Sequence, residues 1–224
     1  MAAELDGPRL PPRAGGRPRQ LVVFLHGFGA DGNDLIDIGR AWQTLLPQAA
    51  FISPHAPEPC SMAPTGRQWF ALTFRDPRER WTGVNAAAPI LNRFLDVELA
   101  RHGLGARALA LVGFSQGTMM ALHVGLRRAA APAAIVGYSG MLVLPGEDPA
   151  TVAGDIRARP PVLLLHGEAD DLIPVDALFH AAHGLSALGV PTEWHLAHGV
   201  GHGIDAEGLR HGGEFLARRF AAAG

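Results

Sequence analysis

A chain of 224 residues, 48% hydrophobic and 18% charged, has room for one large core and is too apolar for a disordered protein. The formal net charge is −2, so no basic field is available to bind nucleic acid, and no apolar run reaches the roughly 18 residues of a membrane span, which argues against stable membrane insertion. A single cysteine, Cys60, excludes a disulfide framework and a cysteine-based zinc site and favours a cytoplasmic location.

Apolar runs of strand length alternate along the chain with stretches of helical spacing. Strands are predicted at residues 21–25, 49–52, 108–112, 134–136, 162–165 and 193–196. Helices are predicted within residues 35–46, 90–99, 119–126, 175–185 and 209–220, and Pro89 marks a helix start or a kink. Most of these runs are apolar throughout rather than alternating, which is typical of strands buried on both faces of a parallel sheet.

This alternation predicts an α/β fold in a single domain over residues 1–224. We expect a mostly parallel central sheet flanked by helices on both faces, without a large cap domain. Residues 1–20 form an N-terminal arm, expected to fold as a hairpin that turns at residues 14–16 and leads into the first long strand. Its arginines lie among prolines and glycines without an apolar centre, so we expect no secretory signal there.

Four strand ends carry the residue types of a nucleophilic active site. They are His26–Gly29, Gly113–Gly117, His166–Asp171 and His198–Gly203. Open α/β sheets bind ligands beyond the carboxyl ends of their strands, so these segments are expected to meet. A glycine-rich loop, a serine, a carboxylate and a histidine follow one another in the order Ser, Asp, His, which is the order of an α/β-hydrolase.

Each part has a chemical role in nucleophilic catalysis. Ser115 is the candidate nucleophile, and His202 is the candidate base that takes the serine proton and returns it to the leaving group. Asp170 is the candidate acid that orients the imidazole. The backbone N–H groups of Phe28 and Gln116 are the candidate oxyanion hole. Gly113 and Gly117 are expected because side chains there would collide with the neighbouring strand and helix.

Residue spacing alone leaves two assignments open. Asp171 competes with Asp170 for the role of the acid, and His195 and His198 compete with His202 for the role of the base. The same histidine spacing resembles a metal-ligand pattern, but neither cysteine nor a carboxylate cluster accompanies it. We therefore predict no metal site and no cofactor.

A long connection, residues 54–82, lies between a predicted strand and a predicted helix, and connections of that length are commonly functional. Trp69 either fixes this connection to the core or forms a wall of an acyl pocket, and the sequence does not decide between the two. Leu172, next to the candidate carboxylates, is a second candidate for substrate binding.

Together, His26–Gly29, Gly113–Gly117, His166–Pro174 and Gly201-His202 resemble the phospholipase/carboxylesterase family of α/β-hydrolases, and residues 66–70 resemble its bacterial members. The resemblance implies Ser115 as nucleophile, His202 as base, and oxyanion donors at Phe28 and Gln116. It also implies Asp170 as the acid, because the family acid stands four positions before the proline of that turn. Asp171, where relatives often have proline, and Phe28, where several have leucine, depart from the pattern and lie at the site mouth.

The sequence therefore predicts a cofactor-free serine carboxylesterase that acts on a small acyl ester through an acyl-enzyme, with thioesters and lysophospholipids as further substrates. The short segment between Tyr138 and Val162 predicts an open site that prefers single-chain acyl groups to bulky triglycerides. A serine peptidase on the same fold and a non-catalytic binding protein are the alternatives. The oligomeric state is left open, a homodimer included.

Overall fold

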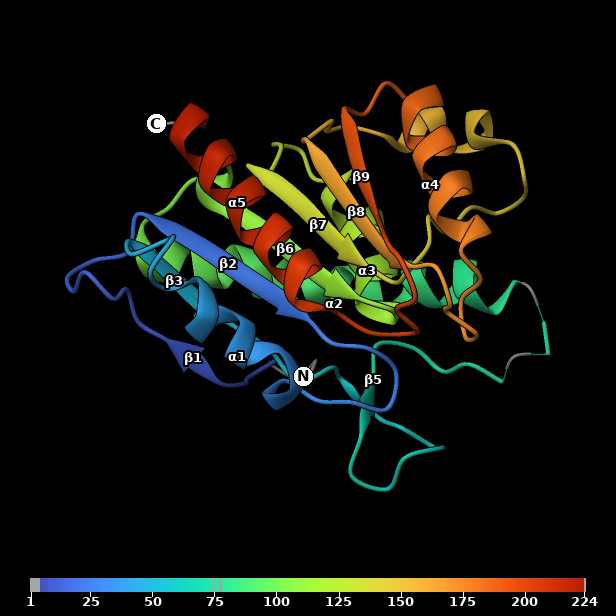
Figure 1. Ribbon diagram of the computed structural model, residues 1–224, viewed down its shortest axis with the longest axis horizontal. Helices are drawn as coiled ribbons and strands as arrows, with labels where there is room; N and C mark the ends of the chain where they lie inside the picture. The colour runs from blue at the N-terminus through green and yellow to red at the C-terminus, as the bar shows by residue number, and fades with distance from the viewer. Residues whose placement is uncertain (1–4, 74, 77, 224) are drawn as a thin grey trace.

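The computed structural model describes residues 5–73, 75–76 and 78–223, and its centre is a seven-stranded sheet (Figure 1). The strands are β1 (Arg9–Leu10), β2 (Gln20–Leu25), β3 (Ala49–Ile52), β6 (Leu109–Phe114), β7 (Ala134–Tyr138), β8 (Val162–Gly167) and β9 (Thr192–Ala197). Their order is β1-β3-β2-β6-β7-β8-β9, and only β1 is antiparallel to its neighbour. The carboxyl ends of β2, β6, β7, β8 and β9 therefore share one edge, where a ligand site is expected.

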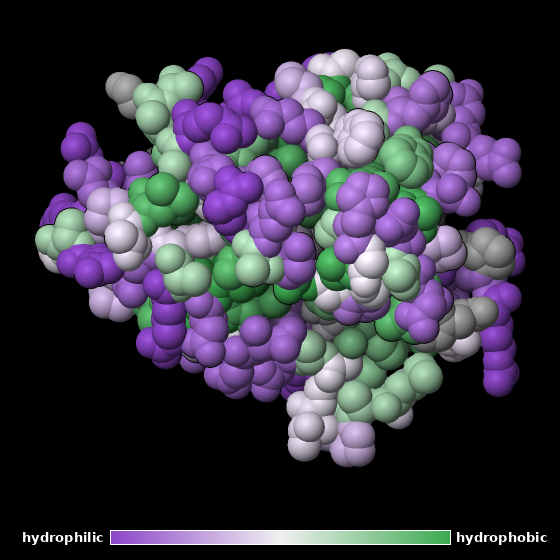
Figure 2. All heavy atoms as spheres, viewed as in Figure 1, coloured by the Kyte–Doolittle hydropathy of each residue, from purple (hydrophilic) through white to green (hydrophobic). Residues whose placement is uncertain are grey.

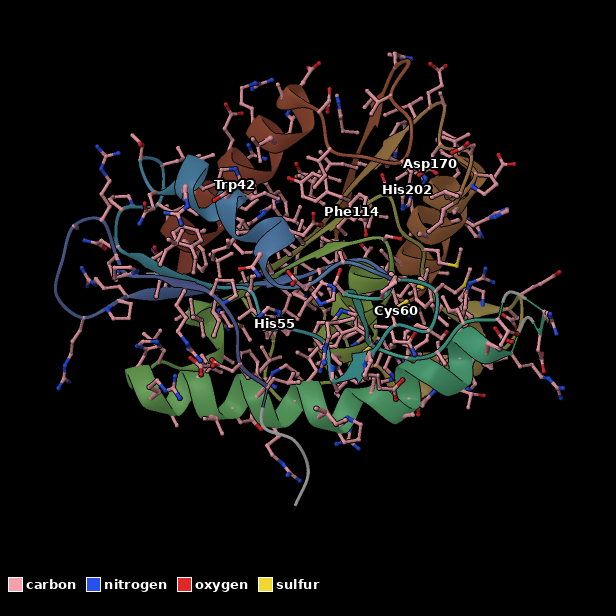
Figure 3. All side chains as sticks on the ribbon, turned by 90° about the horizontal axis from the view of Figure 1, so that it is seen from below. Trp42, His55, Cys60, Phe114, Asp170 and His202 are labelled. Carbon is pink, nitrogen blue, oxygen red and sulfur yellow. The ribbon has the colours of Figure 1, made fainter. Side chains whose placement is uncertain are left out.

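Helices cover both faces of this sheet. They are α1 (Asn33–Trp42), α2 (Glu79–His102), α3 (Gln116–Gly125), α4 (Asp176–Ala187) and α5 (Ala206–Ala223), with short 3-10 helices η1 (Ala106–Ala108) and η2 (Pro149–Asp155). Figure 1 shows α1 and α5 in front of the sheet and α2 and α3 behind it, and Figure 3 shows α2 on the side opposite α1 and α5. Strand β2 supplies both layers: Leu21, Val23 and Leu25 pack with α2, α3 and α4, whereas Val22 and Phe24 pack with α1 and α5.

The predicted α/β-hydrolase architecture is confirmed. The central strands β2, β3, β6, β7 and β8 are almost entirely buried because both of their faces are covered, as the sequence indicated, whereas the edge strand β9 exposes Glu193 and Trp194. The hydrophilic side of α5 forms much of the surface in the view of Figure 2. Among the described residues, no helix is both long and apolar enough to cross a membrane.

One helix boundary differs from its prediction. Pro89 does not start a helix but lies inside α2, which begins at Glu79. Val84, Ala87 and Leu91 are buried on both sides of the proline, so packing against the sheet overrides its low helix propensity. The helix ends at His102 and is capped by Gly103, which has a φ of 67° and donates its N–H to the carbonyl of Ala100 at 3.1 Å.

The N-terminal arm turns where it was predicted to turn but is not a hairpin. Gly15 and Gly16 both have a φ of 73°, which a glycine adopts without strain. However, β1 pairs with β3, which lies between β1 and β2. Arg9 fixes the arm to α2 because its Nη1 lies 2.6 Å from Oε2 of Glu98, a carboxylate that is only 1% exposed.

The long connection contains a small structure of its own, the two-stranded sheet of β4 (Glu58–Pro59) and β5 (Arg67–Gln68). Arg67 ties this hairpin to the glycine-rich loop: its carbonyl accepts from the N–H of Gly29 at 2.9 Å, and its N–H donates to the carbonyl of Ala30 at 2.7 Å. The hairpin therefore supports the loop that carries Phe28.

Candidate active site

Ser115 lies in a sharp turn between β6 and α3. Its φ of 54° and ψ of −115° place a non-glycine residue in a region that side chains rarely adopt, and such strain is concentrated at functional sites. The turn is held by the Ser115 N–H, which donates to the carbonyl of Tyr138 at 2.9 Å, and by the N–H of Thr118, which donates to the Ser115 carbonyl at 3.0 Å. The backbone therefore lifts this serine out of the end of the sheet.

The glycines around the turn are required by close approach of the backbone. A Cβ on Gly117 would lie 1.7 Å from the carbonyl oxygen of Leu25, and one on Gly113 would lie 2.4 Å from the carbonyl oxygen of Gly117. The collision expected from the sequence is thus present at both positions. A Cβ on Gly27 would lie 3.4 Å from the Cβ of Ser115, so the glycine-rich loop lies directly against the serine.

Asp170 and His202 form a close pair at the same edge of the sheet. Oδ2 of Asp170 lies 2.7 Å from Nδ1 of His202, and the carboxylate is fully buried. Oδ1 accepts the backbone N–H groups of Leu172 at 3.0 Å and Ile173 at 2.9 Å, which fixes the carboxylate in its turn. The His202 ring lies 5.0 Å from the ring of Phe114, the residue before Ser115, and Figure 3 shows Phe114, His202 and Asp170 gathered in one region.

The structure distinguishes between the candidates for the acid and the base that residue spacing left open. Asp171 is exposed, whereas the neighbouring Asp170 contacts the imidazole. His198 is exposed and lies 3.2 Å from Glu168, and His195 packs against His211 of α5. Of the three histidine candidates, the structure brings only His202 to the buried carboxylate.

Two further residues support the pair and were not singled out from the sequence. Nε2 of His166 lies 2.8 Å from the carbonyl of Ile173, which can only accept, so Nε2 carries the proton and also faces Asp170 at 3.3 Å. Ser139, with a φ of 43°, donates its hydroxyl to the carbonyl of Gly203 at 3.3 Å. These contacts fix the carboxylate turn and the loop that carries His202.

The Gln116 side chain connects the serine turn to the long connection. Its Oε1 accepts the N–H of Trp69 at 2.9 Å, and its Nε2 donates to the carbonyl of Phe70 at 2.8 Å. The indole N–H of Trp69 donates to the carbonyl of His26 at 3.0 Å. Trp69 is only 1% exposed, so the structure favours its interpretation as an anchor and gives an acyl chain no face of the indole to contact.

The side chains of Phe28 and Leu172 differ in their exposure to solvent. Phe28 is partly buried against the core, and Leu172 is 71% exposed directly after the two aspartates. A large apolar side chain with that exposure is available to a ligand at the site mouth.

A cavity of about 550 Å³ lies between the segment after β7 and α4. Its lining mixes apolar and polar side chains: the apolar ones include Met141, Leu142, Val143, Leu144, Ala177 and Ala181, and the polar ones are Arg80, Glu147, His180 and His183. The segment begins in contact with the turn, because a Cβ on Gly140 would lie 2.9 Å from the carbonyl oxygen of Ser115. Apolar lining next to a few polar groups is typical of ligand sites.

His26 is a buried neutral imidazole. Its Nε2 accepts the N–H of Ala56 at 3.0 Å, so Nδ1 carries the proton and donates to the carbonyl of Gly27 at 2.8 Å. Burial lowers the pKa of His26 from 6.5 to about 4, and burial beside Arg127 lowers the pKa of His123 to about 3.

These two histidines are expected to make the protein less stable in mild acid. The unfolded chain binds a proton below pH 6.5 and the folded chain does not, so the free energy of unfolding falls as the pH drops towards each folded pKa. Relative to neutral pH, each histidine is expected to lower it by about 2 kcal/mol near pH 5. Urea denaturation at both pH values measures the loss. His123→Leu should remove about half of it, whereas stability that stays constant would contradict the assignment.

The strand order, the strained serine turn and the buried Asp–His pair define the chain as an α/β-hydrolase. A profile of the phospholipase/carboxylesterase family matches residues 13–219, and the chain belongs to that family. The family supports ester hydrolysis as the class of reaction.

Individual relatives agree with this assignment. Esterase YpfH of Escherichia coli is 27% identical over 192 residues, covering 86% of this chain and 79% of the relative. Acyl-protein thioesterase 1 of Gibberella zeae is 28% identical over 211 residues, covering 88% of this chain and 89% of the relative. The crystal structure of esterase PE8 is similar with a TM-score of 0.91 and 40% identity, covering 96% of this chain and 99% of that one.

Proposed function

We propose that the chain is a serine carboxylesterase that cleaves esters of single-chain carboxylic acids through an acyl-enzyme on Ser115. The observation that carries the proposal is the 2.7 Å contact between buried Asp170 and His202, next to a serine held in a strained strand-to-helix turn. A serine hydroxyl is a weak nucleophile until a base removes its proton, and an oriented imidazole is that base.

In the proposed reaction, the Ser115 hydroxyl attacks the ester carbonyl while His202 accepts its proton. The imidazolium, stabilised by Asp170, then protonates the leaving alcohol or thiol, which departs and leaves the acyl-enzyme. A water molecule then attacks the acyl carbonyl while His202 accepts its proton. His202 returns this proton to the Ser115 oxygen as the carboxylic acid leaves, which restores the free enzyme.

The oxyanion is proposed to bind the backbone N–H groups of Gln116 and Phe28. Gln116 is the first residue of α3, where backbone N–H groups have no acceptor within the helix. The Gln116 side chain is held by Trp69 and Phe70, so the donor is preorganised. Removing one such donor typically costs about 2.7–4 kcal/mol of transition-state stabilisation.

The acyl chain is proposed to lie along the apolar side chains of the cavity between residues 141–144 and α4, and exposed Leu172 is proposed as a further apolar contact. Buried methylene groups contribute about 0.8 kcal/mol each, so affinity is expected to rise with chain length until the cavity is filled. Cytoplasmic location and a homodimer stay predictions.

A substrate series tests the class of reaction. We expect the enzyme to hydrolyse p-nitrophenyl esters, with kcat/KM rising from acetyl to medium-length acyl groups, and to leave the matching p-nitroanilides almost untouched. Ser115→Ala serves as the blank. Faster cleavage of anilides would favour the peptidase, a preference for emulsified triglycerides would contradict the open single-chain site, and no turnover of any substrate would favour a binding protein.

Narrowing the cavity tests where the acyl chain lies. Ala177→Phe places a ring in the cavity and is expected to lower kcat/KM for octanoyl esters by about tenfold while acetyl esters change little. Ser186→Phe, on an exposed position of the same helix, is the matched control. Equal losses for short and long esters, or no loss for either, would place the acyl chain elsewhere.

A further inference from the structure

A second group of metal-ligating side chains lies between β9 and α5. It consists of His195 on β9 and of Glu207 and His211 on α5. Glu207 and His211 are four residues apart, so they share one face of the helix, and His195 faces them across the strand. One ligand atom from each side chain lies within 4.8 Å of those of the others.

One ring nitrogen of His195, a member of this cluster, is unsatisfied. Its Nε2 is buried and has no hydrogen-bond partner within the described part of the chain. Its ring lies 4.5 Å from the ring of His211. Because buried polar atoms are normally paired, a partnerless ring nitrogen beside a second imidazole and a carboxylate indicates a site whose remaining partner is a ligand.

We propose that His195, Glu207 and His211 bind a divalent transition-metal cation, with Zn²⁺ as the chemical match. Two imidazoles and one carboxylate form a known zinc ligand set with an open fourth position for water. With zinc–ligand bonds of about 2.0–2.2 Å, ligand atoms around a tetrahedral ion lie roughly 3.4 Å apart. Nε2 of His211 and Oε1 of Glu207 are already 3.4 Å apart, so only modest adjustment towards His195 is required.

The neighbouring charges set a limit on affinity. Nη2 of Arg210 lies 3.3 Å from Nε2 of His211 and 3.8 Å from Oε1 of Glu207, so it competes for both ligands. Nη1 of Arg210 lies 2.9 Å from both carboxylate oxygens of Glu214. Glu214 therefore still binds Arg210 when a cation displaces the guanidinium from His211 and Glu207. We therefore expect reversible binding, weaker than that of a cysteine-ligated structural zinc.

Binding at this place would join the two ends of one loop. Residues 198–205 connect β9 to α5 and carry His202, and the three ligands flank that loop on both sides. Glu193 already connects the same two elements through Arg218 and Arg219. A bound cation would add a second clamp between strand and helix, so it should raise the thermal stability of the folded chain.

The test uses the full, tag-free chain after treatment with a chelator. Isothermal titration with ZnCl2 is expected to show one ion bound per chain. Glu207→Gln and His211→Gln should each weaken binding by about tenfold or more, because each removes one of three ligands. The matched control His198→Gln, an exposed imidazole three residues after His195, should bind zinc like the wild type.

Thermal unfolding supplies the second measurement. Zinc should raise the Tm of the wild type and of His198→Gln clearly more than that of the two ligand variants. Glu207 is 59% exposed and His211 33% exposed in their side chains, so both variants should fold and melt like the wild type without metal. Absence of saturable binding in the wild type, or equal affinity in wild type and both ligand variants, would overturn the proposal.

Discussion

Ser115→Ala is expected to lower kcat for a p-nitrophenyl ester by about 10⁴–10⁶-fold, the largest effect of any single change, because the proposed acyl-enzyme could no longer form. Alanine has the same backbone restrictions as serine at a φ of 54°, so the fold should be retained. Steady-state rates and circular dichroism of the purified variant measure both expectations.

The matched control is Ser186→Ala, which removes an exposed hydroxyl from α4 and should keep wild-type rates. More than about 1% residual activity in Ser115→Ala, after exclusion of wild-type contamination, would mean that another group attacks the ester.

Asp170→Asn is expected to lower kcat by about 10⁴-fold with intact folding. The asparagine oxygen can still accept the N–H groups of Leu172 and Ile173, which keeps the turn. Its amide nitrogen then faces Nδ1 of His202 as a donor, so the imidazole is held in the wrong tautomer for accepting the serine proton.

Asp171→Asn is the adjacent control. Its side chain is exposed, so a change of no more than about threefold in kcat is expected, as for most surface substitutions. If Asp171→Asn lost activity and Asp170→Asn kept it, the assignment of the acid would be wrong.

The strands could be predicted closely because a strand buried on both faces leaves a continuous apolar run. Each of the six predicted strands forms, and the range 49–52 is reproduced by β3. The short strands β1, β4 and β5 have two residues each and leave no periodic signal. The partner of β1 also could not be predicted, because pairing with β3 depends on tertiary packing of the arm.

The sequence predicted those parts of the candidate site that depend on which strand ends meet. It did not predict those parts that depend on the direction in which a side chain points. Residue types and order placed Ser115, His202 and an aspartate at one edge of the sheet. Spacing could not separate Asp170 from Asp171, which differ in burial and not in chemistry. Trp69 left two interpretations because its sequence neighbourhood does not reveal that its indole N–H donates to the carbonyl of His26.

The His195, Glu207 and His211 cluster illustrates the same limit. From the sequence, His195 was grouped with His198 and His202, which lie near it along the chain, and no metal site was predicted. In the structure the three histidines contact different partners. The packing of α5 against β9 brings Glu207 and His211 to His195. Glu207 lies twelve residues after His195, and a separation of that length does not indicate from the sequence that the two side chains meet.

Covalent labelling with a fluorophosphonate tests most directly whether the buried carboxylate and the imidazole at the sheet edge activate this one serine. Intact mass and peptide mapping of the wild type should show one adduct per chain, on Ser115, although the chain contains four other serines. His202→Gln should label at least about 10³-fold more slowly, because the hydroxyl has lost its base. An adduct on a different serine, or an unchanged labelling rate in His202→Gln, would contradict the account.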